Sequence, residues 1–479
     1  MTRPGLVSPL WPATCERRSG HAPGPKTCWP RSMAGKRPRV RAGLTRLALV
    51  AAALLVLAGC GRWFGEPDAP PLPGERLSIL LDRTELTVDP TLAGEPIVLP
   101  PPVNNPEWPQ AAGFPSGAMH HLWIDDLPAR AWRTSIGRSA SRSQPRLPPP
   151  VVAGGRVFVM DADHRVGAHD AGSGARIWQT ALAPRRERGH IPGGIAVDQG
   201  RVFATTGFAD VVALDAESGE ELWRRRLDSP MRAAPTAREG RVFVITVNNI
   251  LYALAASDGN ELWTYQGIAE TAALVGGGSP VVDAGVVVAP FSSGEVAALR
   301  VENGLVLWTD SFGPMRRTDE LGSIAHVRAA PVLDRGLVLA VSYGGVMAAI
   351  DLRTGQRIWD ESIGGVERPW VAGDHVFVVS ANRELVCLDR ATGQVRWVTA
   401  LPAYEDPERR RRPIQWTGPV LVSDRLVLAG SHGQVITASP YTGELLGRID
   451  MPDRVTVPPV VADGTLFFLS RNAQLVAYR

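Results

Sequence analysis

The side chains that could do chemistry in this 479-residue chain are few and scattered. Four cysteines occur, at positions 15, 28, 60 and 387, and none belongs to a Cys-x-x-Cys pair. His120 and His121 are adjacent, but no cysteine or carboxylate accompanies them at the spacing of a zinc site. The sequence contains no zinc-protease, phosphate-loop or nucleophile-elbow motif. It therefore predicts no catalytic residue, no metal site and no cofactor.

Cys60 is the cysteine to which the sequence assigns a chemical role. It follows a basic region, an apolar run over residues 47–57 that is too short to span a bilayer as a helix, and the residues Leu-Ala-Gly. Leu-Ala-Gly-Cys resembles the lipobox of bacterial lipoproteins, which implies that Cys60 is acylated and begins the mature chain. An ordinary signal peptide with a chance cysteine is the alternative. We interpret residues 33–59 as a lipoprotein signal peptide and residues 1–32 as an upstream extension that is not translated.

Charge and proline are unevenly distributed. The chain has a net charge of +3, but the first 60 residues hold ten Lys and Arg and one acid, whereas the remainder holds 41 Arg and 47 Asp and Glu. The mature chain is thus mildly acidic, which argues against nucleic acid as a partner. Eleven prolines between positions 67 and 109 favour extended chain over helix. We therefore interpret residues 60–127 as a Pro-rich tether.

A repeated phrase organises the rest of the chain. In its clearest copy, Ala349–Trp359, a small residue is followed by Gly six positions later and by Trp ten positions later. Copies recur about every 44 residues, and such a period indicates a repeat architecture. Six copies carry both the glycine and the tryptophan: Gly174 and Trp178, Gly219 and Trp223, Gly259 and Trp263, Gly304 and Trp308, Gly355 and Trp359, and Gly393 and Trp397. A seventh copy has Gly443 followed by Gly447, so its Trp is missing.

Each copy predicts two strands joined by a tight turn, in which glycine supplies the positive φ and the second strand carries a buried Trp. Two short apolar segments precede each copy, giving four antiparallel strands per unit, which is typical of a propeller blade. Trp132 begins the ring with a lone outer strand, and residues 459–478 end it with three strands. The sequence predicts an all-β, eight-bladed β-propeller of four-stranded antiparallel blades over residues 128–479. Its ring is closed by the N- and C-terminal strands.

Two connections between blades are longer than the others. One runs from Thr309 to Ala330 and contains Arg316 and Arg317, and the other runs from Val398 to Gly418 and contains four consecutive arginines. Connections from an outer strand to the next inner strand emerge on one face of a propeller, and insertions there often form the binding face. We therefore expect partners to dock on this face.

The repeat resembles that of quinoprotein alcohol dehydrogenases. This chain lacks the adjacent cysteine pair and the long insertions that build the cofactor and calcium site in those enzymes. The repeat, the eight blades, the length and the lipobox together resemble the BamB family, the B lipoproteins of the outer-membrane β-barrel assembly machinery. This resemblance covers Cys60 and residues 128–479. It implies a non-catalytic scaffold, lipid-anchored on the periplasmic face of the outer membrane, that docks the central barrel subunit; unfolded outer-membrane proteins are further candidate partners.

In that family, two neighbouring inter-blade loops dock the periplasmic domains of the central subunit, one through a Leu/Arg stretch and the other through an Asp-x-Asp pair. The corresponding places here read Ala-Ala-Leu-Val and His-Val-Arg, so His and Arg replace the acids. The candidate partner-binding residues are Leu274, Val275, Arg316, Arg317, His326 and Arg328. Two alternatives stay open: a periplasmic sensor or polysaccharide-binding propeller, and a pyrroloquinoline quinone-dependent dehydrogenase.

We expect the substitution Cys60→Ala to release the protein from membranes. Cys60 is the residue predicted to carry the acyl chains, and each buried CH₂ group contributes about 0.8 kcal/mol to membrane binding. Fractionation of cells into soluble and membrane proteins measures the effect, with Cys387→Ala as the matched control that stays with the membranes. Quantitative sedimentation of the Cys60→Ala protein with outer membranes would contradict acylation at this residue.

Overall fold

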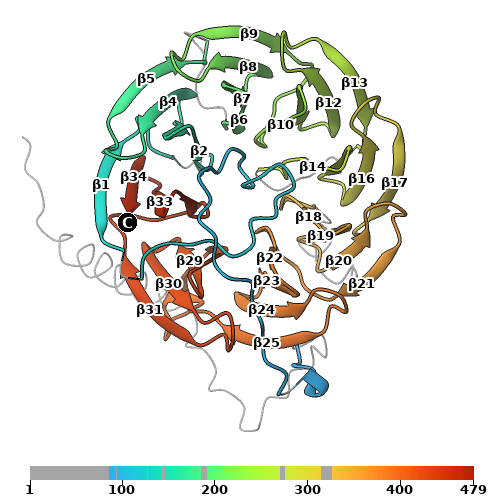
Figure 1. Ribbon diagram of the computed structural model, residues 1–479, viewed down its shortest axis with the longest axis vertical. Helices are drawn as coiled ribbons and strands as arrows, with labels where there is room; N and C mark the ends of the chain where they lie inside the picture. Colours follow the sequence, from blue (N-terminus) through green and yellow to red (C-terminus); the bar gives the residue numbers. More distant parts are fainter. Residues whose placement is uncertain are drawn as a thin grey trace, which may run out of the picture. The chain divides into compact units, whose positions relative to one another are not determined.

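The computed structural model describes residues 86–92, 94–126, 128–141, 146–184, 191–269, 276–313 and 326–479. Eight four-stranded antiparallel sheets stand around a common axis in this part of the chain (Figure 1). Each sheet is one blade, with its first strand beside the axis and its fourth strand on the outside of the ring. The predicted eight-bladed, all-β propeller is confirmed.

The first seven blades follow the chain in order, and each runs from the inside of the ring to the outside. Blades one to four are β2 (Val151–Ala153), β3 (Arg156–Met160), β4 (Arg165–Asp170) and β5 (Arg176–Ala181); β6 (Gly194–Asp198), β7 (Arg201–Thr205), β8 (Asp210–Asp215) and β9 (Glu221–Arg226); β10 (Thr236–Arg238), β11 (Arg241–Ile245), β12 (Ile250–Ala255) and β13 (Glu261–Gln266); and β14 (Val281–Asp283), β15 (Val286–Pro290), β16 (Glu295–Arg300) and β17 (Val306–Ser311). Blades five to seven are β18 (Val332–Asp334), β19 (Leu337–Val341), β20 (Met347–Asp351) and β21 (Arg357–Glu361); β22 (Trp370–Ala372), β23 (His375–Val379), β24 (Glu384–Asp389) and β25 (Val395–Ala400); and β28 (Trp416–Val422), β29 (Arg425–Gly430), β30 (Gln434–Ala438) and β31 (Leu445–Asp450).

Blade eight is built from both ends of the propeller sequence. Its inner strands are β32 (Val460–Ala462), β33 (Thr465–Leu469) and β34 (Gln474–Tyr478), and its outer strand is β1 (Arg130–Ser135). β1 pairs antiparallel with β34, and Trp132 lies opposite Ala477. This pairing confirms the predicted closure of the ring. Outside the blades lie a short hairpin, β26 (Tyr404–Asp406) with β27 (Arg411–Pro413), and one 3₁₀ turn, η2 (Pro90–Leu92).

With one exception, each blade is joined to the next by a tryptophan that lies against a glycine. A Cβ atom added to Gly355 would come within 2.5 Å of the Trp308 side chain of the preceding blade, and the Trp308 indole N–H donates to the carbonyl of Leu352 at 2.8 Å. The same paired contact occurs at seven of the eight junctions between the described blades, as Trp132 with Gly174, Trp178 with Gly219, Trp223 with Gly259, Trp263 with Gly304, Trp308 with Gly355, Trp359 with Gly393, and Trp397 with Gly443. These glycines are therefore needed for space as well as for the turn.

The exception is the junction between blades seven and eight, where Gly447 replaces the Trp. In blade eight, strands β34 and β1 come from distant parts of the chain, so no hairpin turn joins them. Blade eight therefore offers no glycine turn against which a Trp of blade seven could lie. This explains the missing Trp in the seventh copy of the repeat.

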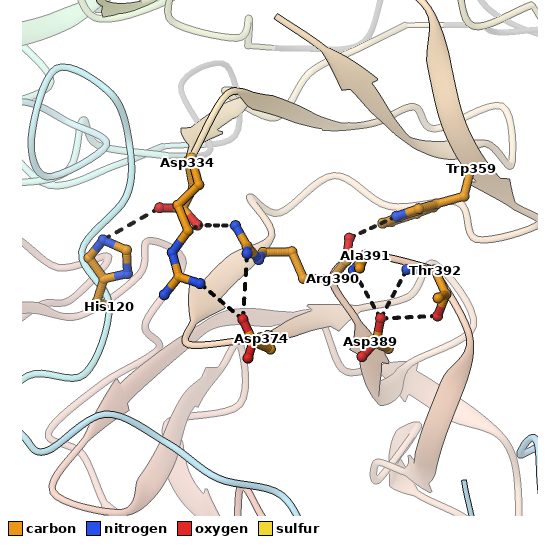
Figure 2. Close-up of polar contacts among 9 residues, drawn as sticks. His120, Asp334, Trp359, Asp374, Asp389, Arg390, Ala391 and Thr392 are labelled. Carbon is orange, nitrogen blue, oxygen red and sulfur yellow. Dashed lines mark hydrogen bonds and ion pairs between the residues drawn. The ribbon is translucent and has the colours of Figure 1, made fainter. Parts of the chain in front are cut away.

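Polar side chains hold the hairpin turn that bears each glycine, as Figure 2 shows for blade six. The carboxylate of Asp389 accepts hydrogen bonds from the backbone N–H groups of Ala391 and Thr392 and from the Thr392 hydroxyl, at 2.9–3.0 Å. The indole of Trp359 in blade five donates to the carbonyl of Arg390 in the same turn, at 2.9 Å. A short side chain that bonds to its own backbone thus fixes the turn that receives the neighbouring Trp.

Residues 103–122, which we call the axial segment, circle the axis inside the innermost strands (Figure 1, blue). Backbone hydrogen bonds of 2.7–3.2 Å join it to six blades, including one from Asp463 of blade eight to the carbonyl of Asn105. The others pair Trp108 with Val152, Pro109 with Val197, Pro115 with Val282, Ser116 with Leu333, and Leu122 with Leu421. Because these innermost strands are at the inner edge of their sheets, the axial segment satisfies backbone groups that would otherwise be unpaired.

Side chains join the axial segment to blades three and six and add a second contact with blade eight. The buried amide of Gln110 exchanges two hydrogen bonds of 3.1 Å with the backbone of Ala237 in blade three. Trp370 of blade six donates to the carbonyl of His120 at 2.8 Å, and Asn105 donates to Val461 of blade eight at 2.7 Å. These residues fall within the span predicted as a tether, and here they are an integral part of the ring. The predicted tether boundaries as a whole stay a prediction.

The axial segment lies against a network of ion pairs in blades five and six (Figure 2). The buried carboxylate of Asp334 at the end of β18 lies 2.9 Å from the Arg390 guanidinium and 3.7 Å from the His120 ring. His121 accepts a hydrogen bond of 3.0 Å from the backbone N–H of Asp424 in blade seven. The two adjacent histidines thus have separate structural partners.

We expect Gly355→Ala to reduce the free energy of unfolding by several kcal/mol. An alanine there has a positive φ of 74°, which costs about 1–2 kcal/mol, and its Cβ overlaps Trp308, which adds about 1–3 kcal/mol of overpacking. The matched control is Gly336→Ala, because Gly336 has a φ of 79° but no atom within 4 Å of an added Cβ. Urea unfolding of both variants separates the two costs. If both variants lost the same free energy of unfolding, contact with Trp308 would not be what prevents a side chain at residue 355.

Candidate functional site

The six candidate partner-binding residues fall into two groups. Leu274, Val275, Arg316 and Arg317 lie outside the described residues, as does the predicted acylation site Cys60. His326 and Arg328 precede β18 and lie beside the axis, where His326 is buried and Arg328 is half-buried. Their role in partner binding stays a prediction. Both residues line hollows beside the central axis of the ring.

A cavity of about 200 Å³ lies at the centre of the ring, and we call it the axial cavity. Its wall is formed by the residues that lead into the first strands of seven blades and by Trp108, Ala111 and Ala112 of the axial segment. The cavity is therefore at the end of the ring where each outer strand connects to the next inner strand. Five prolines line the wall, at positions 148, 149, 192, 458 and 459. Since proline has no backbone N–H, this part of the wall offers few neutral donors.

Arginines dominate the charge of the axial cavity. Its lining contains Arg146, Arg232, Arg328 and Arg368, against a single acid, Glu367. Glu367 is buried; one of its oxygens lies 3.5 Å from the Arg146 guanidinium, and the other accepts a hydrogen bond of 2.9 Å from the Thr417 hydroxyl. The lining thus carries three positive charges in excess, and its one carboxylate already has two partners.

Arg368 is held in place by aromatic rings. Its guanidinium carbon lies 5.4 Å from the ring centroid of Trp370 and 5.9 Å from that of Trp108, and these two rings are stacked with centroids 6.1 Å apart. Such contacts attract a cation and restrict its movement. Nη1 of Arg368 is buried and has no hydrogen-bond partner among the described residues. The guanidinium is thus oriented by the fold but incompletely hydrogen-bonded.

Burial and neighbouring arginines lower the pKa values of Arg328 and His326, the two candidate residues within the described part of the chain. Burial, together with the nearby charge of Arg146, lowers the pKa of Arg328 to about 10, although Glu367 opposes the shift. Burial and the charge of Arg328 lower the pKa of His326 to about 4. At pH 7, Arg328 is therefore charged and His326 is neutral. His326 consequently adds no charge to this part of the ring.

Sequence reasoning missed Arg146, Arg232, Glu367 and Arg368 as members of one site. A signal was available, because each lies shortly before the first strand of a blade, the position that the repeat fixes next to the axis. A comparison of charged residues by their position within the repeat would have grouped them.

Among the described residues, no three His, Cys, Asp or Glu side chains are grouped as they would be around a metal ion. Nor does that part of the chain contain a helix long and apolar enough to cross a membrane.

Sequence comparison relates the chain to one family. The family described as "Outer membrane protein assembly factor BamB" matches residues 162–399. The factor of Escherichia coli strain K12 is 32% identical over 352 residues, which cover 72% of this chain and 87% of that protein. The factor of Xanthomonas campestris pv. campestris is 32% identical over 358 residues, which cover 73% of this chain and 85% of that protein.

Structural comparison finds the same ring in proteins of different function. BamB from Moraxella catarrhalis superposes with a TM-score of 0.63 at 18% identity, covering 74% of this chain and all of that one. Quinohemoprotein alcohol dehydrogenase from Comamonas testosteroni superposes with a TM-score of 0.59 at 13% identity, covering 78% of this chain and 81% of that one. At these identities the likeness is one of fold alone.

We expect Glu367→Gln to lower the free energy of unfolding by about 1–3 kcal/mol, because it removes the only carboxylate that offsets four lining arginines. The loss is greatest at low salt, since the Debye length shortens from about 30 Å at 0.01 M to about 10 Å at 0.1 M. Urea unfolding at two salt concentrations measures it. Glu302→Gln, at an exposed turn between β16 and β17, is the control and should change little. Similar losses in both variants would refute a specific role for Glu367.

Proposed function

Because this chain belongs to the family of outer membrane protein assembly factor BamB, we propose that it is a scaffold protein of outer-membrane β-barrel assembly. The identity with the Escherichia coli factor, which extends over most of that protein's length, carries the proposal. Fold alone could not carry it, because the same ring occurs in alcohol dehydrogenases. The proposed scaffold acts by binding and orienting other proteins rather than by catalysis.

We place the scaffold on the periplasmic side of the outer membrane, anchored through acyl chains on Cys60. The proposal rests on the Leu-Ala-Gly-Cys sequence and on Gly61, because the mature chain then lacks the second-position Asp that commonly retains lipoproteins at the inner membrane. Several acyl chains are needed for stable anchoring, since one chain gives only marginal binding.

The proposed partner is the central barrel subunit of the assembly machinery, docked through the connection that contains residues 272–275 and the connection from Thr309 to Ala330. All six candidates belong to the proposed surface: Leu274, Val275, Arg316, Arg317, His326 and Arg328. Because Arg328 is half-buried in the axial cavity and His326 is buried and neutral, we assign the main charged contacts to Arg316 and Arg317. Two arginines favour an acidic patch on the partner, since like charges across an interface cost several kcal/mol.

Unfolded outer-membrane proteins are the proposed clients, and the outer strands are the surface that suits them. These strands are the outward edges of their sheets and have unpaired backbone groups, to which an extended chain can add as a further strand. An exposed apolar residue directly precedes the Trp in five of them: Ile177, Leu222, Leu262, Leu307 and Ile358, with exposed fractions of 37–51%. These side chains supply apolar contacts beside the backbone edge.

We expect the double substitution Arg316→Glu and Arg317→Glu to weaken association with the central barrel subunit, most strongly at low salt, because rim charges act mainly on association rate and salt dependence. Co-purification from membranes solubilised in mild detergent, at low and moderate salt, measures the effect. The matched control is Arg409→Glu with Arg411→Glu, which reverses two exposed arginines near the β26–β27 hairpin. Loss of the subunit from the control alone would move the docking surface to the connection between blades six and seven.

A further inference from the structure

The guanidinium group of Arg368 in the wall of the axial cavity does not use all of its hydrogen-bond donors. Nη1 of Arg368 is buried without an acceptor among the described residues, while the Trp108 and Trp370 rings hold the guanidinium in place. A buried donor without a partner destabilises a protein, and more so if the donor is charged. An acceptor that enters the cavity removes this penalty, so the site favours a ligand that supplies one.

We propose that the axial cavity is a binding site for a small anion that carries two or more carboxylate or phosphate groups. Guanidinium groups match both kinds of oxygen acid, because their N–H donors are arranged in a planar fork. The site goes beyond the scaffold role, since neither membrane anchoring nor partner docking requires a ligand in the centre of the ring.

More than one anionic group is needed because the positive charge is spread around the wall. Arg146 precedes blade one, Arg232 precedes blade three, Arg328 precedes blade five and Arg368 precedes blade six. Glu367 is engaged by Arg146 and Thr417 and neutralises one charge, which leaves three in excess. The mutual repulsion of Arg146 and Arg328 adds to the preference, because a bound anion relieves it.

The size of the axial cavity favours a small ligand. Its volume of about 200 Å³ is below the roughly 300–1,000 Å³ of pockets that take drug-sized molecules. The axial segment contributes Trp108, Ala111 and Ala112 to the wall of the cavity. Arg232 also lines the cavity and is exposed, so a ligand can reach it from solvent.

Isothermal titration calorimetry of the full chain in mild detergent at low salt tests the proposal, with citrate, pyrophosphate and acetate as probes. We expect citrate or pyrophosphate to bind once per chain, and acetate, which has a single carboxylate, to bind at least tenfold more weakly. Citrate binding without pyrophosphate binding identifies carboxylates as the preferred group, and the reverse result identifies phosphates. Binding of neither overturns the proposal.

Variants locate the binding in the axial cavity. Arg368→Gln should weaken the stronger probe at least tenfold, since hydrogen bonds to charged groups contribute about 1.5–3 kcal/mol and 1.4 kcal/mol corresponds to a factor of ten. Arg232→Gln should also weaken it, and because Arg232 is exposed, this variant decides the question if Arg368→Gln does not fold. Arg448→Gln, on the exposed outer strand β31, is the charge-matched control and should bind as wild type.

Three results would count against the site. An equal loss in Arg448→Gln would show that the probes respond to overall charge, and acetate binding as tightly as citrate would remove the case for a multivalent ligand. A hexaglutamate peptide that binds while citrate and pyrophosphate do not would show that the arginines receive an acidic chain segment instead of a small molecule.

Discussion

The ring depends on one contact, in which an indole from one blade fills the space that a Cβ atom would need in the next. The glycine cannot be replaced without displacing the Trp, and the Trp satisfies its own N–H by donating to the same turn. Because the contact links neighbouring blades at a fixed position, its repetition sets both the spacing of the blades and the sequence period. The single junction without it is the one where the receiving turn does not exist.

Hydrogen bonds from the axial segment are the second set of interactions that hold the blades together. The tryptophans join each blade only to its neighbour, whereas residues 103–122 contact all eight blades. Most of these contacts are backbone hydrogen bonds to the innermost strands, so they depend little on side-chain identity. The same segment supplies Trp108, which both pairs with Val152 and stacks near Arg368, and thereby couples the ring to the axial cavity.

The fold could be predicted from the sequence because its main interaction leaves a visible pattern. Gly and Trp recur together, and the half-blades at Trp132 and at residues 459–478 are complementary, so the eight-bladed ring and its closure followed. The axial segment has no such pattern, because a Pro-rich chain that pairs through its backbone has no side-chain periodicity. The arginines of the axial cavity were missed for another reason. Arg146 and Arg368 are about 220 residues apart and become neighbours only when the ring closes.

The axial segment also determines the order in which the native state can be completed. It precedes every blade in the sequence, yet its hydrogen-bond partners are distributed from Val152 to Asp463. Loops of such length are entropically costly to close, and long-range pairing slows folding. Neighbouring blades can form from local contacts as they follow one another along the chain. The axial segment can therefore complete its hydrogen bonds only when the innermost strands of all the blades are in place.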